Sequence, residues 1–391
     1  MTAVQLMCAR LGLVTGLGLA GVIRRRYSRW VLWGACALLV IANVINIAAD
    51  LGGMAEATLL VIGAPVALMV PVYGLVMVSL LMWSSYRTIA RVFKWLTLVL
   101  LAYVLTAFIA HVNGRLAVQA TVLPHLAWSR AFFSVLVAIL GATISPYLFF
   151  WQAAQEVEEE RALGRDLAQR RGATPAELQA CRTDVVTGMF GSNAIMYFII
   201  MTTAATLHAH GMTHITSAQE AAEALRPLAG AGSWLFTVGL IGTGILAVPV
   251  LAGSCAYAIA EAAAWRGSLN RRPRRAKKFY LVLTVAMVLG IVLNYAGLNA
   301  ITLLFTAAVI NGVLAPPLIV IVLDRRSNRH GTRRQFAHRC VPRLAHVRGH
   351  GRGRTRTRLR RLMRRGAAWD GAVGGRCPGH PSRRWEGTAC A

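Results

Sequence analysis

The sequence has little negative charge. Only 15 of its 391 residues are Asp or Glu, against 42 Lys and Arg, and the formal net charge is +27. It also lacks a nucleophile beside a matching base, a glycine loop that would cradle phosphate, and the His/Glu motif of a membrane metalloprotease. Because the sequence offers no candidate catalytic residues, we do not expect an enzyme.

Closely spaced cysteines are missing as well. The seven cysteines form no CxxC or other metal-binding spacing; they are Cys8, Cys36, Cys181, Cys255, Cys340, Cys377 and Cys390. Three of them lie in or beside apolar runs, where a buried free thiol is ordinary. The sequence therefore predicts neither a disulfide framework nor a resident cofactor.

Long uncharged apolar runs are abundant. A membrane-spanning helix needs about 20 apolar residues, and eight runs of suitable length cover 31–49, 66–85, 95–112, 131–152, 185–207, 234–260, 279–296 and 301–323. A ninth run, 11–23, is short and rich in glycine. Three arginines follow it where a signal peptide would have its cleavage site, which argues against a signal peptide. We predict an all-α polytopic membrane protein.

Lys and Arg alternate between the loops. Loops 24–29, 86–94, 155–184 and 265–278 are rich in them, whereas 50–65 and 297–300 have none, 208–233 has one and 113–130 has two. Because basic loops stay on the cytoplasmic side, this alternation orients the chain and supports the number of spans.

The composition changes after Leu323. We expect residues 1–323 to form the transmembrane domain, and 324–391 to be an arginine-rich tail without a packed core. The stretch RGRTRTRLRRLMRR would attract anionic lipid or nucleic acid. Alternatively the tail is an unselected sequence, such as a frameshifted end of a GC-rich gene, and its attraction is incidental.

One predicted span contains a helix breaker. In GATISPYLFFWQ, Pro146 removes the hydrogen bond to the carbonyl of Ala142. An unpaired carbonyl in hydrocarbon is costly, so we expect this break to line a cavity or to bind a cation, as broken helices of transporters do. Ala142, Thr143, Ser145 and Tyr147 would supply neutral oxygens. The alternative is an ordinary proline kink packed against a neighbouring helix, because Pro71, Pro249, Pro316 and Pro317 also lie in spans.

Acidic and histidine side chains near the spans are further candidates. Asp50 and Glu56 either mark an ion or proton path or lie solvated at the outer interface. Asp184 is expected at a helix start and Glu261 near a helix end. His208 and His210, with His214, are weak metal candidates in an outer loop. The four glutamates of EVEEER (156–161) are predicted to form a solvated helix end, or to concentrate cations at an exit.

Four stretches of the sequence resemble a known family. ARLGLVTGLGLAGVIRRRYSRW, NIAADLGGMAEA, ATISPYLFFWQ and GILAVPVLAGSCAYAIAEA are similar to the natural-resistance-associated macrophage protein (NRAMP) divalent-metal transporters, and most to the bacterial NRAMP-related branch that includes magnesium transporters. The resemblance runs from about residue 4 to residue 323. It implies a LeuT-type inverted-repeat bundle in which the eight spans are helices three to ten, and residues 1–16 are the end of helix two.

The resemblance also implies roles for single residues. Ala142 matches a metal-ligating carbonyl and Asp50 an acid of the proton route. Ser145 replaces a methionine thioether and Tyr147 a histidine linked to proton movement, while Gly53 replaces a second acid of the route. Losing a soft ligand favours the hard cations Mg²⁺ or Mn²⁺, with Fe²⁺ as the softer alternative. Losing the histidine argues against proton coupling.

The family's first helix, with its anionic ligand, has no counterpart in the sequence. We therefore expect a chain that is truncated at its N-terminus and has an aberrant C-terminal tail, and whose full transport needs the missing helix. The sequence predicts divalent-cation transport by alternating access, in a multi-pass protein of the bacterial inner membrane. Its partners would be the metal substrate and the lipid bilayer, with no specific nucleic acid. The alternative is an inactive membrane fragment with a basic tail that binds anionic lipid or nucleic acid.

Overall fold

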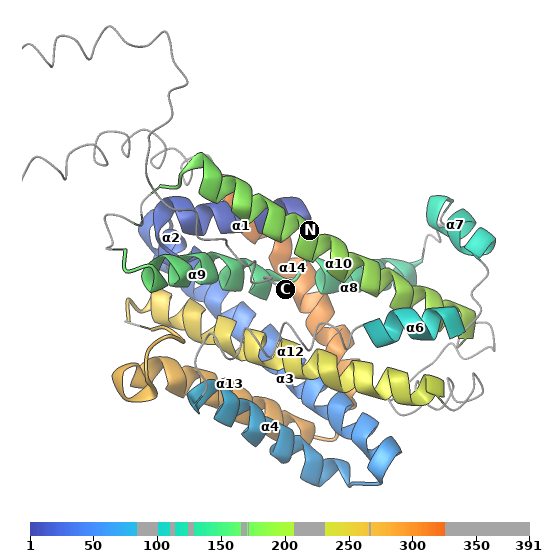
Figure 1. The fold of residues 1–391 in the computed structure, drawn as a ribbon. Helices are drawn as coiled ribbons and strands as arrows, with labels where there is room; N and C mark the ends of the chain where they lie inside the picture. Colours follow the sequence, from blue (N-terminus) through green and yellow to red (C-terminus); the bar gives the residue numbers. More distant parts are fainter. Residues whose placement is uncertain are drawn as a thin grey trace, which may run out of the picture. The chain divides into compact units, whose positions relative to one another are not determined.

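The computed structural model describes residues 1–83, 101–109, 114–123, 129–165, 170, 172–206, 231–265 and 267–324. Within these ranges the chain is helical and contains no strand (Figure 1). The helices are α1 (Thr2–Thr15), α2 (Leu19–Arg26), α3 (Arg29–Ile62), α4 (Val66–Trp83), α6 (Leu101–Ile109), α7 (Gly114–Val122), α8 (Arg130–Thr143), α9 (Pro146–Ala162), α10 (Pro175–Thr206), α12 (Ala231–Ala262), the short 3₁₀ helix η2 (Pro273–Arg275), α13 (Lys277–Asn294) and α14 (Ala300–Leu323).

Seven helical segments of the described chain are long and apolar enough to span a membrane, or eight if the bent pair α1 and α2 counts as one span. This confirms a polytopic helical bundle. The predicted run 11–23 is not one helix, because Gly16 ends α1 in the left-handed conformation (φ 63°) and the pair bends by 70°. Half of the predicted span 95–112 lies outside the described residues, which cover 101–109 as α6.

Two helices extend well beyond the apolar runs that predicted them. Helix α3 continues from the run 31–49 to Ile62, and α10 begins at Pro175, ten residues before the predicted start at 185. Asp184 is therefore an exposed residue inside α10, and its expected place at a helix start was wrong. Hydropathy finds only the apolar part of a helix, whereas backbone hydrogen bonds continue through polar residues.

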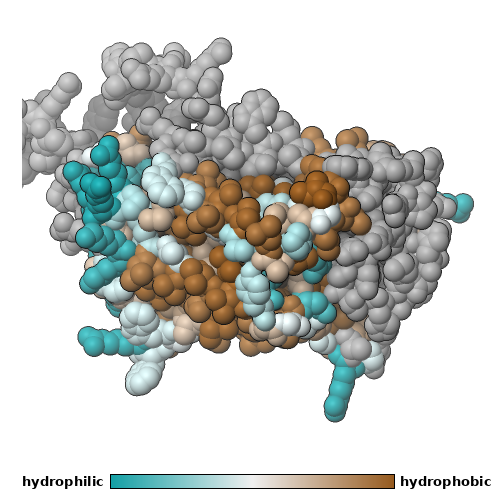
Figure 2. Space-filling model, turned by 90° about the horizontal axis from the view of Figure 1, so that it is seen from below, coloured by the Kyte–Doolittle hydropathy of each residue, from teal (hydrophilic) through white to brown (hydrophobic). Residues whose placement is uncertain are grey.

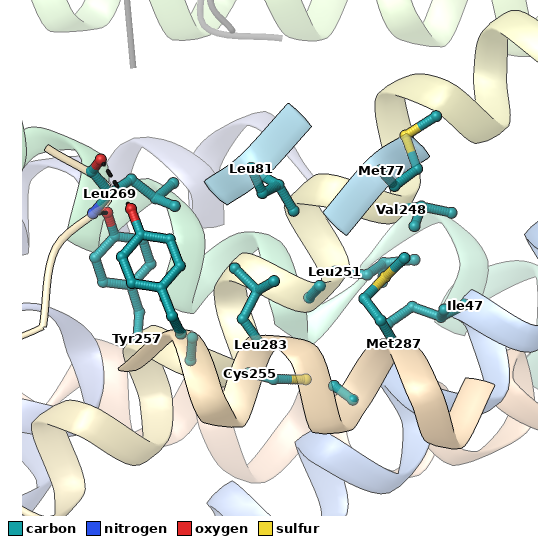
Figure 3. Packing of buried hydrophobic residues seen from close by; sticks show 14 of the residues in the cluster. Ile47, Met77, Leu81, Val248, Leu251, Cys255, Tyr257, Leu269, Leu283 and Met287 are labelled. Carbon is teal, nitrogen blue, oxygen red and sulfur yellow. Dashed lines mark hydrogen bonds between the residues drawn. The ribbon is translucent and has the colours of Figure 1, made fainter. Parts of the chain in front are cut away.

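The buried core has two main clusters of apolar side chains. One joins α3, α4, α12 and α13 around Ile47, Leu251 and Met287 (Figure 3). The other joins α1, α2, α3, α9 and α14 around Leu11, Leu39 and Phe149. Since lipid is as apolar as these side chains, close packing rather than the hydrophobic effect holds such helices together.

Contacts between loops agree with the alternation of basic charge. The Tyr27 hydroxyl donates to Asp324 (3.0 Å), and Ser268 donates to Glu158 (2.5 Å), so the ends of α2, α9, α12 and α14 meet on the side with the basic loops. The opposite ends meet where the Tyr295 hydroxyl donates to the Ala67 carbonyl (2.6 Å). On the face that Figure 2 shows, the described side chains between the helix ends are mostly hydrophobic, as a lipid-facing surface must be.

Candidate functional site

The predicted helix break is present in the span Phe132–Ala162. Helix α8 ends at Thr143, Ile144 has a non-helical backbone (φ −105°, ψ 63°), and α9 begins at Pro146 with Ser145 as its N-cap. Proline is well suited to the first position of a helix, where its missing N–H leaves no further group unpaired. The span is therefore two helices joined by a two-residue step.

The carbonyl freed by this break has a partner within the chain. The Ser145 hydroxyl donates to the Ala142 carbonyl (2.8 Å) and approaches that of Gly141 (3.3 Å). The Thr143 hydroxyl donates to the Ile139 carbonyl (2.9 Å). The expectation that the break needs a cavity or a cation to replace its lost hydrogen bond was therefore wrong, because Ser145 supplies that bond.

The oxygens in these hydrogen bonds still have lone pairs that could bind a cation. A carbonyl has two lone pairs, and a hydroxyl that donates still accepts. Ser145 is 5% exposed, and the Ala142 side of the step is exposed. Ala142, Thr143, Ser145 and Tyr147 thus remain a predicted set of neutral oxygen ligands.

Asp50 lies on a helix that packs beside the break. Tyr147 is half-buried against both core clusters, and one of these contains Leu51, the residue after Asp50. Asp50 lies inside α3, 12 residues before its end at Ile62, and Glu56 follows it in the same helix. A carboxylate beside a broken helix is the arrangement that an ion path would need. His208 and His210, with His214, lie outside the described residues.

The Gly53 position has open space. A Cβ built there meets no atom within 4 Å. The backbone therefore has room for the first side-chain carbon of a larger residue at this position.

Sequence reasoning missed Asn311 on α14. It is 2% exposed, and its side-chain oxygen has no hydrogen-bond partner in the described part of the chain. It lies next to Gly312, where α14 crosses α8: a Cβ on Gly141 would be 2.5 Å from the Gly312 nitrogen. An amide in an apolar run was the available signal, since a buried, unpaired amide oxygen is costly.

Three of the four glutamates of EVEEER are buried, so the prediction of a solvated helix end was wrong. Glu156, Glu158 and Glu160 are 8%, 1% and 2% exposed. Glu156 accepts from Gln152 (2.9 Å), which in turn accepts from Gln5 on α1 (3.1 Å), and Glu160 pairs with Arg165 (2.8 Å).

Arg165 also pairs with Glu177 at the start of α10. Its partial burial lowers the pKa of the guanidinium, but the hydrogen bonds and charges of Glu177 and Glu160 outweigh burial and raise that pKa above its usual value. Arg165 stays charged and fixes the end of α9 to α10.

Known proteins match the chain over most of its length. The model of the natural resistance-associated macrophage protein-like family matches residues 1–339. A divalent metal cation transporter MntH of Xanthomonas campestris is 30% identical over 262 residues, covering 62% of this chain and 54% of its own length. The MntH of Mesorhizobium japonicum is 27% identical and covers 62% of this chain and 53% of its own length. The MntH of Aeromonas hydrophila is 28% identical and covers 62% of this chain and 58% of its own length.

The chain spans little more than half the length of these curated relatives. The family model nevertheless covers all of the described helices, from α1 to α14. The match, the several spans and the broken helix agree with the resemblance inferred from the motifs. The chain belongs to the natural resistance-associated macrophage protein-like family of multi-pass membrane proteins.

Proposed function

We propose that the chain transports divalent metal cations across a membrane by alternating access, and that it is not an enzyme. The observation that carries this is the step between α8 and α9, a break inside a candidate membrane span that gathers the backbone and hydroxyl oxygens of Ala142, Thr143 and Ser145. Relatives named divalent metal cation transporters support the cation class.

We assign the cation site to Ala142, Thr143, Ser145 and Tyr147, with the Asn311 amide oxygen as a further ligand from α14. All five groups are neutral oxygens and none is a thioether, which favours Mg²⁺ or Mn²⁺ over softer ions such as Fe²⁺. Mg²⁺ keeps several waters, and these would complete its coordination around so few direct ligands.

Transport in this proposal is not coupled to protons. In this proposal Asp50 is the carboxylate assigned to the ion path, and Gly53 offers no second acid to hand a proton on. The membrane is the bacterial inner membrane, with the basic loops on the cytoplasmic side.

Uptake into proteoliposomes tests the proposal. The full chain is reconstituted in vesicles that contain a Mg²⁺- or Mn²⁺-sensitive dye, with and without a pH gradient. We expect a weak cation-dependent signal that Tyr147→Ala abolishes and that the pH gradient leaves unchanged. Thr306→Ala, at an exposed position on α14, is the matched control and should transport normally. Uptake by Tyr147→Ala at the rate of the parent chain would refute the site, and no uptake by the parent would refute transport.

A further inference from the structure

The loop between α12 and α13 has a fixed shape. Its Leu269 N–H donates to the Tyr257 hydroxyl (3.2 Å), and the Tyr280 hydroxyl donates to the carbonyls of Leu269 (3.4 Å) and Arg271 (3.0 Å). Figure 3 shows Tyr257 and Leu269 together at one edge of the core cluster. Both tyrosines lie on spans, so they tie the loop backbone to the membrane domain.

A buried carboxylate holds the same loop from the other side. Glu158 of α9, 1% exposed, accepts hydrogen bonds from Ser268 (2.5 Å) and Asn270 (3.3 Å), besides that from Arg161 (2.7 Å). Hydrogen bonds to a charged acceptor are about twice as strong as neutral ones. We call residues 267–278, which these contacts hold in place, the basic loop.

The basic loop presents six exposed cationic side chains. They are Arg271, Arg272, Arg274, Arg275, Lys277 and Lys278, and three of them, Arg272, Arg274 and Arg275, lie in or next to η2. The three ion pairs found in the described residues involve Arg161 and Arg165 and none of these six. Six like charges within eight residues repel one another, so an external anion would stabilise the arrangement.

The loop lies where a membrane's phosphates would be. It connects the candidate spans Thr237–Ala262 and Lys277–Asn294 directly. Lys278 lies over the ring of Trp265 at 5.0 Å from its centre. Tryptophan is enriched at the level of the lipid head groups, which places the cations of the loop at that level too.

We infer that the basic loop binds the phosphate head groups of anionic lipids in the cytoplasmic leaflet. A run of four to eight basic residues next to a span is the usual footprint of such binding. A nucleic acid is disfavoured, because its phosphates would have to approach the anionic surface of the same leaflet. The orientation of the chain in the membrane depends only on how many positive charges the loop carries. The contacts of Glu158, Tyr257 and Tyr280 also fix where those charges lie, which a lipid-binding site needs.

Native mass spectrometry of the full chain in detergent tests this inference. The chain is titrated with phosphatidylglycerol, and with phosphatidylcholine of the same acyl chains as a neutral reference. We expect R271Q/R272Q/R274Q/R275Q to lower the association constant for phosphatidylglycerol by about tenfold or more, and to leave phosphatidylcholine binding unchanged. R271K/R272K/R274K/R275K keeps the charges and should bind like the parent chain, which separates lost binding from misfolding.

The matched control removes four charges elsewhere. R352Q/R354Q/R356Q/R358Q changes the arginine-rich tail, which attracts anionic lipid by its charge alone, and we expect it to lower phosphatidylglycerol binding clearly less than the loop variant does. A loop variant that binds like the parent, or a tail variant that removes the lipid preference, would overturn the inference. So would a short RNA that displaces the lipid from the parent chain but not from the loop variant.

Glu158→Gln tests whether the fixed shape matters. It keeps all six cations and raises the net positive charge, so charge alone predicts tighter binding of phosphatidylglycerol. Release of Ser268 and Asn270 from the carboxylate should instead weaken binding severalfold if the loop must be held in place. Tighter binding by Glu158→Gln would contradict a fixed lipid site.

Discussion

Helices α8 and α9 are two parts of one span, yet they are built in opposite ways. Helix α8 is apolar and largely exposed, with Phe133, Val135 and Ile139 each close to half exposed, and it packs mainly on α14. Helix α9 buries most of its residues, including three glutamates, against α1, α2 and α12. The break at Ile144 and Ser145 separates a lipid-facing helix from a helix with a polar core.

The difference shows what each part can do. Among the described helices α8 packs mainly on α14, and a helix with one close neighbour can tilt while the rest of the bundle stays in place. A helix held by buried ionic contacts would have to break them to tilt. In an alternating-access cycle we therefore expect α8 to move and the end of α9 to stay fixed.

The largest effect is expected where α8 touches α14. A Cβ on Gly141 would lie 1.8 Å from the Ala308 carbonyl oxygen, so Gly141→Ala must push two backbones apart. We expect a loss of about 3 kcal/mol in the free energy of unfolding, measured by denaturant titration in mixed micelles.

The control for this change is Gly191→Ala in α10. A Cβ there meets nothing within 4 Å, so a gain of up to about 1 kcal/mol is expected from the better helix former. Equal effects of the two substitutions would contradict a close α8–α14 contact.

The next effect concerns the polar core of α9. Glu158→Ala leaves Ser268, Asn270 and Arg161 without their shared acceptor, and should cost about 2 kcal/mol in the same assay. Glu159→Ala, one residue on and only half-buried, should cost less than about 0.5 kcal/mol. If both variants lose the same amount, the buried network does not stabilise α9 in the way described.

A smaller effect is expected at the break itself. Ser145→Ala removes the hydroxyl that donates to the Ala142 carbonyl, and should lower the free energy of unfolding by about 1 kcal/mol. Thr143→Ala, whose hydroxyl bonds carbonyls that already belong to the helix, should cost about half as much. A neutral Ser145→Ala would mean that the carbonyl finds another partner.

The contrast between α8 and α9 also marks the limit of the sequence. Hydropathy predicted the bundle, and a single proline predicted the break at Pro146, because each depends on local composition or on one residue type. The orientation stays a prediction from the basic loops. Burial of Glu156, Glu158 and Glu160 could not be predicted, since it depends on partners as distant in sequence as Gln5, Ser268 and Asn270. The Ser145–Ala142 hydrogen bond, by contrast, could have been predicted, because a serine hydroxyl often donates to a carbonyl three or four residues back.

The cation site at the step is the central claim, and metal-dependent thermal stabilisation of the purified full chain tests it most directly. We predict that Mg²⁺ or Mn²⁺ raises the unfolding temperature of the parent chain and of Thr306→Ala. The doubly changed chain S145A/Y147F should lose most of that shift, because two of the proposed ligands are gone or altered. A shift of the same size in S145A/Y147F, or no shift in the parent chain, would contradict a cation site between α8 and α9.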